Sequence, residues 1–221
     1  MRQPLFGLGS ARLGSKILLG LVVLATALGA VGANAQAQTI RLPSPTALLA
    51  SGGSAKPTMG WKRYCEDRPA DCAIDVSEPG TVALTTKTWQ TLQRINRKVN
   101  AIIEPMSDSD HWGVEDRWDL AEDGAGDCED YQLLKRKLLV DAGFPRRALL
   151  MTVVIDEERQ GHAVMMIRTD RGDFILDNKR NAILPWSQTG YTYVKREGSG
   201  AGSEWASLGG ATSSPVATAG R

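Results

Sequence analysis

Two stretches of the chain carry apolar residues at the three- and four-residue spacing of a helix with one buried face. The first begins at Thr86 and ends before Pro105. Its apolar stripe consists of Trp89, Leu92, Ile95, Val99 and Ile102. We interpret this stripe as hydrophobic core and not as a cofactor site, because such a stripe normally faces the interior.

The second stretch runs from Asp127 or Cys128 to Ala142. Gly143 follows its last residue and Pro145 lies just beyond, and both residue types end helices. The predicted buried positions are Tyr131, Leu134, Leu138 and Ala142. The sequence therefore predicts a helix whose first turn contains Cys128.

Three strand-like runs follow the second predicted helix, at residues 149–155, 162–167 and 174–176. The turn residues 169–173 join the second and third runs and predict a hairpin. One more strand is expected around Tyr191, Tyr193 and Val194. The pattern as a whole predicts an α+β domain in which helices pack on an antiparallel sheet.

The N-terminus has the order of a secretory signal peptide. Basic residues precede an apolar run over residues 17–31, and small residues with the A-x-A pattern of a cleavage site follow it. The alternative is a retained membrane anchor, but a spanning helix needs roughly 20 apolar residues, more than this run contains. We therefore predict a signal peptide over residues 1–35, a periplasmic or secreted protein, and no stable membrane span after cleavage.

Composition divides the remainder of the chain into further segments. Residues 36–60 are rich in Ala, Ser, Gly and Pro and predict a flexible lead-in, residues 61–207 form the predicted domain, and residues 208–221 are expected to be disordered. Residues 106–125 mix acids, glycines and tryptophans without a period and predict an irregular segment. Solvated loop acids are the ordinary interpretation there, with metal binding by Asp108 or Asp110 as the alternative.

Charge and cysteine content narrow the function classes. Removal of residues 1–35 would take the formal net charge from +1 to −2, so nothing indicates nucleic-acid binding. In an oxidising compartment we expect Cys65 and Cys72, which lie in one short loop-like segment, to form a disulfide. A zinc site is the alternative, but the spacing is unsuitable and only His111 and His162 could complete it. Cys128 is then the odd thiol.

Cys128, His162 and Asp177 have the positions that a nucleophile, a base and an orienting acid require. At the start of a helix, unpaired N–H groups and the helix dipole stabilise a thiolate. His162 begins one predicted strand and Asp177 ends the next, and antiparallel pairing brings these two ends together. Asp177 could then orient the imidazole toward Cys128.

Each of these residues also has an ordinary interpretation. A single buried cysteine often serves only as a small apolar residue, a histidine at a strand end is often only solvated, and Asp-Asn commonly starts a turn. The combination at the helix start and at adjoining strand ends favours the catalytic interpretation.

The residues Gly126-Asp127-Cys128-Glu129-Asp130-Tyr131, the histidine that begins a Val- and Met-rich strand, and Ile175-Leu176-Asp177-Asn178 resemble the bacterial transglutaminase-like cysteine peptidases. The resemblance extends over about residues 61–205. It implies a papain-like, transglutaminase-type fold, a periplasmic location, and a Cys-His-Asp triad at Cys128, His162 and Asp177.

The resemblance also implies a substrate class and a metal. Well-known members of the family cut large surface adhesins and thereby release biofilm, and they bind calcium through the acids beside the catalytic cysteine, which are Asp127 and Glu129 here. An N-cap role for Asp127, paired with Asp130, is the alternative. The long lead-in, the Cys65 and Cys72 pair and the polar residues 132–136 differ from the adhesin-cutting members and indicate another branch.

Three functions follow as hypotheses. The first is a peptidase that cleaves a protein substrate, such as a cell-surface or periplasmic protein, through an acyl-enzyme that water hydrolyses. The second is a transglutaminase, in which an amine replaces water. The third is a periplasmic binding module without turnover, whose Cys128 would show no enhanced reactivity.

Overall fold

The computed structural model describes residues 41–200 and 204–212. The predicted signal peptide at residues 1–35 lies outside the described residues, as does the end of the predicted tail. Within the described ranges, no helix combines the length and the apolar character needed to cross a membrane.

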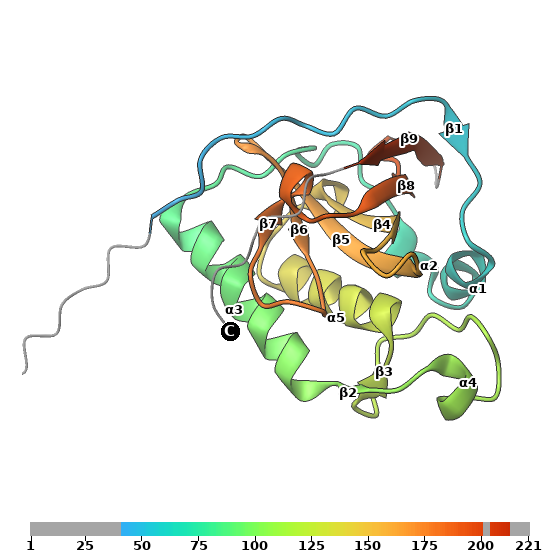
Figure 1. The fold of residues 1–221 in the computed structure, drawn as a ribbon. Coiled ribbons are helices and arrows are strands. Elements are labelled where there is room, and N and C mark those ends of the chain that lie inside the picture. Colours follow the sequence, from blue (N-terminus) through green and yellow to red (C-terminus); the bar gives the residue numbers. More distant parts are fainter. Residues whose placement is uncertain (1–40, 201–203, 213–221) are drawn as a thin grey trace, which may run out of the picture. The chain divides into compact units, whose positions relative to one another are not determined.

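A seven-stranded sheet with neighbouring strands antiparallel forms the centre of the described fold (Figure 1). Its strand order is β1-β9-β8-β4-β5-β6-β7. The strands are β1 (Ser54–Ala55), β4 (Leu149–Ile155), β5 (Gly161–Thr169), β6 (Gly172–Leu176), β7 (Leu184–Pro185), β8 (Thr192–Glu197) and β9 (Trp205–Thr212). A separate parallel pair consists of β2 (Glu104–Pro105) and β3 (Ala125–Gly126).

Two long helices, α3 and α5, lie along one face of the sheet (Figure 1). The helices are α1 (Met59–Asp67), α2 (Pro69–Cys72), α3 (Thr86–Ile102), α4 (Asp108–His111) and α5 (Cys128–Asp141), with short 3-10 turns at Arg146–Ala148 and Trp186–Gln188. The α+β prediction and both predicted helices are confirmed. Apolar residues of α3, α5, β5 and β6 form one continuous core between the helices and the sheet.

The buried faces of the helices differ in part from the prediction. Ile102 is 53% exposed, and Ile103 is buried in its place. In α5 the predicted core residues Leu134 and Leu138 are only half-buried, whereas polar residues are buried. These polar residues are Glu129, Asp130, Gln132, Lys135 and Arg136. The reason is that α5 contacts α3 and β5 as well as the core around α1, so it has no wide solvent face.

The hairpin between β5 and β6 has the predicted position. Thr169 pairs with Gly172, which leaves a two-residue loop, and Met165 pairs with Leu176 near the other end. This register places Asp177, the residue after β6, beside the first half of β5. The strand ends that carry His162 and Asp177 therefore meet.

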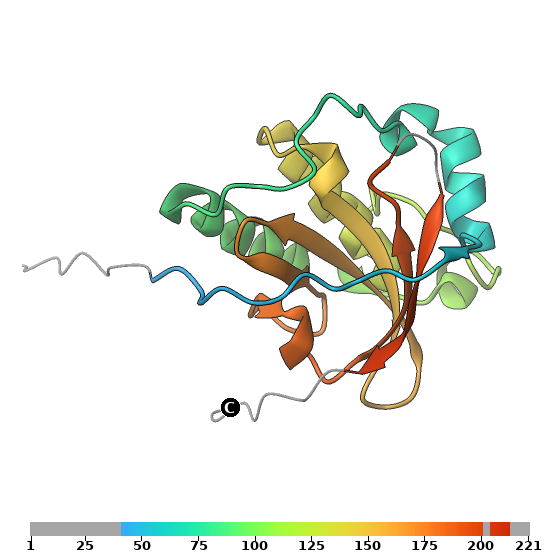
Figure 2. The ribbon, with the colours of Figure 1, turned by 90° about the horizontal axis from the view of Figure 1, so that it is seen from above.

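The lead-in is held against the sheet along its described part, which corrects the prediction of a flexible segment over residues 36–60. The Thr46 N–H donates to the carbonyl of Arg171 at 2.7 Å, and the Leu49 N–H donates to Asp173 at 2.8 Å. A Cβ at Gly172 would lie 2.5 Å from the Thr46 carbonyl oxygen, so only glycine allows this approach. Figure 2 shows the segment, in blue, crossing the strands before β1 pairs with β9.

The C-terminal limit of the domain also differs from the prediction. Strand β9 continues to Thr212, beyond the expected domain end at residue 207. Leu208 is 3% exposed and packs with Leu49, Tyr191 and Tyr193 on the sheet face away from α5. The Gly- and Ser-rich composition of this region concealed a strand, because glycine is depleted in strands and it is pairing with β8 that places this segment in the sheet.

Candidate active site

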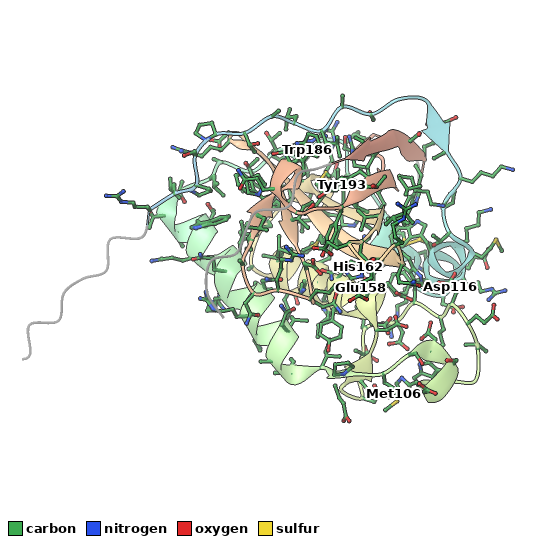
Figure 3. All side chains as sticks on the ribbon, in the orientation of Figure 1. Met106, Asp116, Glu158, His162, Trp186 and Tyr193 are labelled. Carbon is green, nitrogen blue, oxygen red and sulfur yellow. A yellow bond between two sulfur atoms is a disulfide. The ribbon has the colours of Figure 1, made fainter. Side chains whose placement is uncertain are left out.

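The structure brings together the three predicted catalytic residues from three separate elements. Cys128 is the first residue of α5, His162 is the second residue of β5, and Asp177 directly follows β6. His162, labelled in Figure 3, is 5% exposed, and Asp177 is 1% exposed. The site is therefore built at the edge of the core and not in a solvated loop.

His162 and Asp177 form a buried ion pair or hydrogen bond. The Nε2 atom of His162 lies 3.0 Å from Oδ1 of Asp177. Asp177 also accepts the N–H of Lys179 at 3.0 Å and the hydroxyl of Tyr191. Burial disfavours the charge of Asp177, but these hydrogen bonds, that from His162 first, lower its pKa to about 2. Asp177 is therefore an ionised acceptor that fixes the imidazole ring.

Cys128 contacts the strand that carries His162. Its Sγ accepts the backbone N–H of Ala163, the residue after His162, at 3.3 Å. Because Nε2 of His162 is occupied by Asp177, Nδ1 is the ring nitrogen that remains for the thiol. The thiol is partly buried and is the free cysteine of the described residues.

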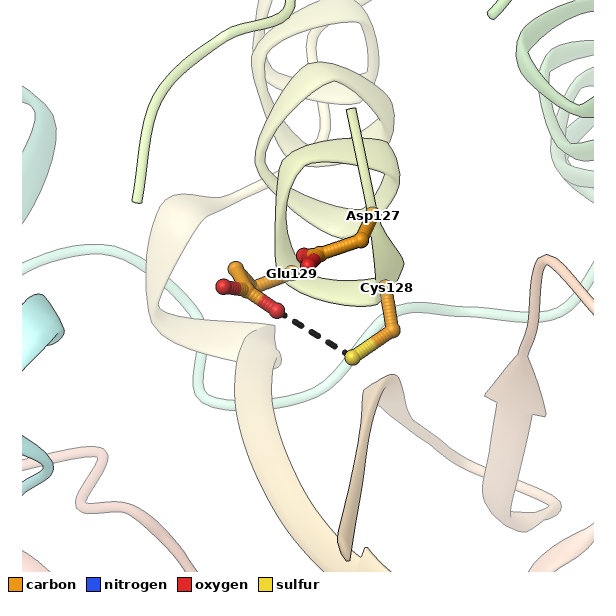
Figure 4. Close-up of side chains that lie close together, drawn as sticks. All are labelled: Asp127, Cys128 and Glu129. Carbon is orange, nitrogen blue, oxygen red and sulfur yellow. Dashed lines mark hydrogen bonds between the residues drawn. The ribbon is translucent and has the colours of Figure 1, made fainter. Parts of the chain in front are cut away.

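The acids around Cys128 oppose the thiolate that the helix start favours. The thiol lies 3.1 Å from Oε2 of Glu129, as the dashed line in Figure 4 shows. Burial raises the pKa of Cys128 well above its ordinary value, and the charge of Glu129 raises it further, whereas the Ala163 N–H opposes the rise. The expected lowering by the helix dipole is therefore outweighed.

A cluster of carboxylates lies beside the start of α5. Ligand oxygens of Asp108, Asp127 and Asp130 all lie within 4.8 Å of one another. Oδ1 of Asp108 and Oδ1 of Asp127 are buried and have no hydrogen-bond partner among the described residues. Asp110, the other acid considered for a metal in this segment, instead accepts the hydroxyl of Ser107 at 2.7 Å.

Mutual repulsion and burial perturb these acids. Burial and the charge of Asp127 raise the pKa of Glu129 to about 10. Burial also raises the pKa of Asp130 to about 8, although the Asp119 N–H opposes this rise, and burial raises that of Asp108. The cluster therefore has a strong affinity for protons or for a cation.

Gly126 allows the acids to approach the chain. A Cβ at this position would lie 2.6 Å from Oδ2 of Asp130. That same oxygen accepts the N–H of Asp127 at 3.2 Å, which fixes the first turn of α5. Position 126, directly before Asp127, is therefore a glycine for a steric reason.

Several supporting residues were not predicted from the sequence. The Asn100 amide donates to the carbonyl of Asp177 at 2.9 Å, and Gln132 donates to Asn178 Oδ1 at 3.4 Å. Tyr191 was predicted only as a strand residue. One signal of such a residue was present in the sequence, because the polar Asn96 lies one turn after Leu92, within the apolar stripe of α3. In the structure Asn96 is fully buried.

The predicted pairing of Cys65 with Cys72 is present as a disulfide with an S–S distance of 2.08 Å. It joins α1 to α2, at the side of the domain that packs on α5. Both sulfurs are used, and His111 pairs with Asp123 at 2.8 Å, so the alternative zinc site is not formed.

Comparison with known proteins gives a family. The model of the bacterial transglutaminase-like cysteine proteinase family matches residues 51–213, well over half of the chain. No curated protein matches the chain. A solved structure of Legionella pneumophila LapG has 26% sequence identity and a TM-score of 0.43, over 49% of this chain and 62% of that chain. A calcium-bound structure of the same protein has 21% identity and a TM-score of 0.48, over 73% of this chain and 88% of that chain.

Proposed function

Because the chain belongs to the bacterial transglutaminase-like cysteine proteinases, a family of cysteine peptidases, we propose that it hydrolyses peptide bonds with Cys128 as nucleophile, His162 as base and Asp177 as the residue that orients the base. The observation that carries this proposal is that the start of α5 meets the strand that carries His162. Sγ of Cys128 accepts the N–H of Ala163, the residue after His162, and Nε2 of His162 lies 3.0 Å from Oδ1 of Asp177.

The pKa values of Cys128 and Asp177 indicate the order of the proton transfer from the thiol to His162. The raised pKa of Cys128 keeps the thiol protonated at rest, so His162 takes its proton as the sulfur attacks the substrate carbonyl. Asp177, ionised at neutral pH, stabilises the imidazolium that forms. The N–H of Cys128 belongs to the unpaired donors of the first helical turn and suits the oxyanion of the tetrahedral intermediate. Water then releases the acyl group.

Alkylation of Cys128 by iodoacetamide tests the Cys-His pair, because the other two cysteines are in a disulfide. We expect the rate, followed by mass spectrometry from pH 5 to 9, to fall in H162A and to remain unchanged in H111A. His111 is the matched control because it is the other histidine of the chain and pairs with Asp123. Equal rates in H162A and the unsubstituted protein would refute the assigned base.

The acids beside Cys128 fit a calcium ion. Asp127 and Glu129 are the ligands expected from the sequence, and Asp108 and Asp130 join Asp127 in the carboxylate cluster. The unpartnered oxygens of Asp108 and Asp127 and the all-carboxylate oxygen set suit this hard cation. Calcium, when bound, supplies the positive charge that balances these acids. This charge would offset the part of the rise in the Cys128 pKa that comes from Glu129 and Asp127, whereas the larger part, which comes from burial, would remain.

The substrate that we propose is an exported protein, in the periplasm or on the cell surface. The Cys65–Cys72 disulfide supports an oxidising compartment. Incubation of extracellular and periplasmic proteins with the enzyme and with C128A, followed by sequencing of new N-termini, tests this proposal. New N-termini that depend on Cys128 support hydrolysis, whereas amine incorporation without new N-termini would refute it.

A further inference from the structure

The two carboxylate oxygens of Asp177 are held by different groups. Oδ1 lies 3.0 Å from Nε2 of His162 and accepts the N–H of Lys179 at 3.0 Å. Oδ2 accepts the hydroxyl of Tyr191 at 2.5 Å and lies 3.7 Å from Nε of Arg180. The oxygen that His162 does not use therefore has its own neutral donor and its own cation.

Arg180 and Tyr191 also contact each other. Nη2 of Arg180 donates to the Tyr191 hydroxyl at 3.2 Å, and the guanidinium carbon lies 5.3 Å from the centre of the Tyr191 ring. Burial and the charge of Asp177 raise the pKa of Tyr191, so its hydroxyl stays protonated and donates. A hydroxyl that accepts one hydrogen bond while it donates another is polarised, which strengthens the bond that it donates. Arg180, Tyr191 and Asp177 therefore form one hydrogen-bonded chain that ends at His162.

Tyr191 contacts the histidine as well as the acid. The rings of Tyr191 and His162 lie 5.8 Å apart between their centres, with an angle of 77° between their planes. Aromatic pairs favour this edge-to-face arrangement. Tyr191 is 0% exposed and directly precedes β8, so its ring has a fixed place in the core. Both members of the proposed His162–Asp177 pair therefore pack against one buried tyrosine.

Helix α3 holds the backbone of Arg180. The carbonyl of Arg180 accepts the side-chain amides of Asn96 at 3.3 Å and of Asn100 at 3.2 Å. The guanidinium also pairs with Glu157 in the loop between β4 and β5, but the Glu157 side chain is 41% exposed and such a pair contributes little. The contacts with α3 and with Tyr191 therefore place the guanidinium beside Asp177.

We propose that Tyr191 and Arg180 are positioning residues that hold the Asp177 carboxylate in the orientation in which Oδ1 accepts from Nε2 of His162. This inference rests on the proposed function, in which Nδ1 of His162 takes the proton of Cys128. The last torsion of an aspartate is broad, so a carboxylate bound only through Oδ1 turns readily. Donors on both oxygens stop this rotation. Without them the imidazole loses its fixed acceptor, and Nδ1 loses its orientation toward the thiol.

A buried tyrosine also needs a hydrogen-bond partner for purely structural reasons, and Tyr193 is the matched comparison. Tyr193, labelled in Figure 3, is likewise 0% exposed. Its hydroxyl lies 3.0 Å from Oγ1 of Thr189 and donates to the carbonyl of Trp186 at 3.2 Å. Y193F therefore removes a buried hydroxyl whose partners lie outside the His162–Asp177 pair.

A double-mutant cycle with D177N tests whether Tyr191 acts through Asp177. We expect iodoacetamide, at one pH and one calcium concentration, to alkylate Cys128 about tenfold more slowly in Y191F, because a hydrogen bond to a charged group is lost. D177N should also be slow, and adding Y191F to it should change nothing further. Y193F should react like the unsubstituted protein. An equal slowing by Y191F in both backgrounds, or by Y191F and Y193F, would overturn the proposal. A D177N rate equal to that of the unsubstituted protein would instead refute the proposed function.

Variants of Arg180 keep the test open if Y191F does not fold, because the Arg180 side chain is 25% exposed. R180M should slow the alkylation, and R180K, which keeps the charge but not the planar group, should lie between R180M and the unsubstituted protein. R171M is the control, because Arg171 lies in the turn at the far end of the β5–β6 hairpin and donates to the carbonyl of Pro43. Equal rates in R180M and R171M would refute the role of Arg180.

The Nε2–H proton of His162 gives a readout that requires no activity. In protein labelled with ¹⁵N histidine, H111A identifies the NMR signal of His162, because the chain has two histidines. We expect the Nε2–H signal to lie downfield in the unsubstituted protein, and to move upfield and exchange faster with water in Y191F and R180M. The signal should stay in place in Y193F and R171M. An unchanged Nε2–H signal in Y191F would overturn the proposal even if the protein proves to be a peptidase.

Discussion

Glu197 is the acceptor for two buried arginines, and its removal should destabilise the domain strongly. It accepts Nη1 of Arg136 at 3.0 Å and Nη2 of Arg146 at 2.7 Å, and it also accepts the N–H of Met151 at 2.8 Å. The side chains of Arg136, Arg146 and Glu197 are 3%, 9% and 5% exposed. This network attaches α5, which carries Cys128, to β4 and β8.

The size of the expected loss of stability follows from the burial of these three side chains. Breaking a buried ion pair by removing one partner costs about 3–5 kcal/mol, because the other charge stays buried without compensation. Glu197→Ala leaves two guanidinium groups in this state, so we expect a loss at the upper end, about 5 kcal/mol. In a domain of this size each kcal/mol corresponds to about 2–4 °C in Tm, which gives a decrease of roughly 10–20 °C.

Urea denaturation followed by far-UV circular dichroism measures this loss. The control is Asp141→Ala, which breaks the exposed pair of Lys137 and Asp141, whose side chains are 50% and 56% exposed. We expect that control to cost less than about 1 kcal/mol. Glu197→Gln keeps the shape and part of the hydrogen bonding and should fall between the two. If Glu197→Ala destabilises no more than Asp141→Ala, the network does not hold α5 in place.

Three further predictions concern the acids, the glycine and the disulfide. In EGTA, the stability of the fold should fall as the pH rises through the raised pKa of Asp130 at about 8, because a carboxyl whose pKa is raised in the folded state stabilises the fold while it is protonated. Calcium should abolish this fall. A series of thermal scans that shows no pH dependence in EGTA would contradict the prediction. Gly126→Ala should destabilise the protein by about 1–3 kcal/mol through the clash with Asp130 and should weaken the calcium-induced rise in Tm. Substitution of Gly124, which has a φ of +90 and open space around it, should also destabilise the protein but should leave the calcium-induced rise in Tm unchanged. Replacement of Cys65 and Cys72 by alanine should cost about 2–3 kcal/mol for a loop of this length, measured by urea denaturation, and an unchanged midpoint would show that α1 and α2 hold their geometry alone.

The parts of the fold that could be predicted are those set by local periodicity. Helix α3 begins at Thr86 and strand β4 spans Leu149–Ile155, as the apolar pattern indicated. Spacing alone also brought His162 and Asp177 together, because a hairpin turn fixes the register of its strands. Local signals were sufficient wherever the partner lay nearby in sequence.

The parts that could not be predicted depend on contacts between distant segments. The burial of Lys135 and Arg136 follows from the enclosure of α5 on several sides, which its own sequence does not reveal. The lead-in has the composition of a linker, and its contacts with the sheet, at Thr46, Leu49 and β1, give it a fixed place. The raised pKa of Cys128 likewise results from tertiary burial together with Glu129, although a helix start alone favours a thiolate.

The order of strands in the sheet has a consequence for how the protein behaves at high concentration. Both outer strands, β1 and β7, are only two residues long, and β7 contains Pro185, which offers no N–H. Long, flat, unpaired strands recruit identical strands from other molecules and so begin aggregation. Each short outer strand pairs with two residues of its longer neighbour, β9 or β6, and the positive φ angles of Gly209 and Gly210 interrupt the regular course of β9 beyond this pairing. Among the described residues, the two outermost strands of the sheet are therefore too short to offer a long edge to an identical strand of another molecule.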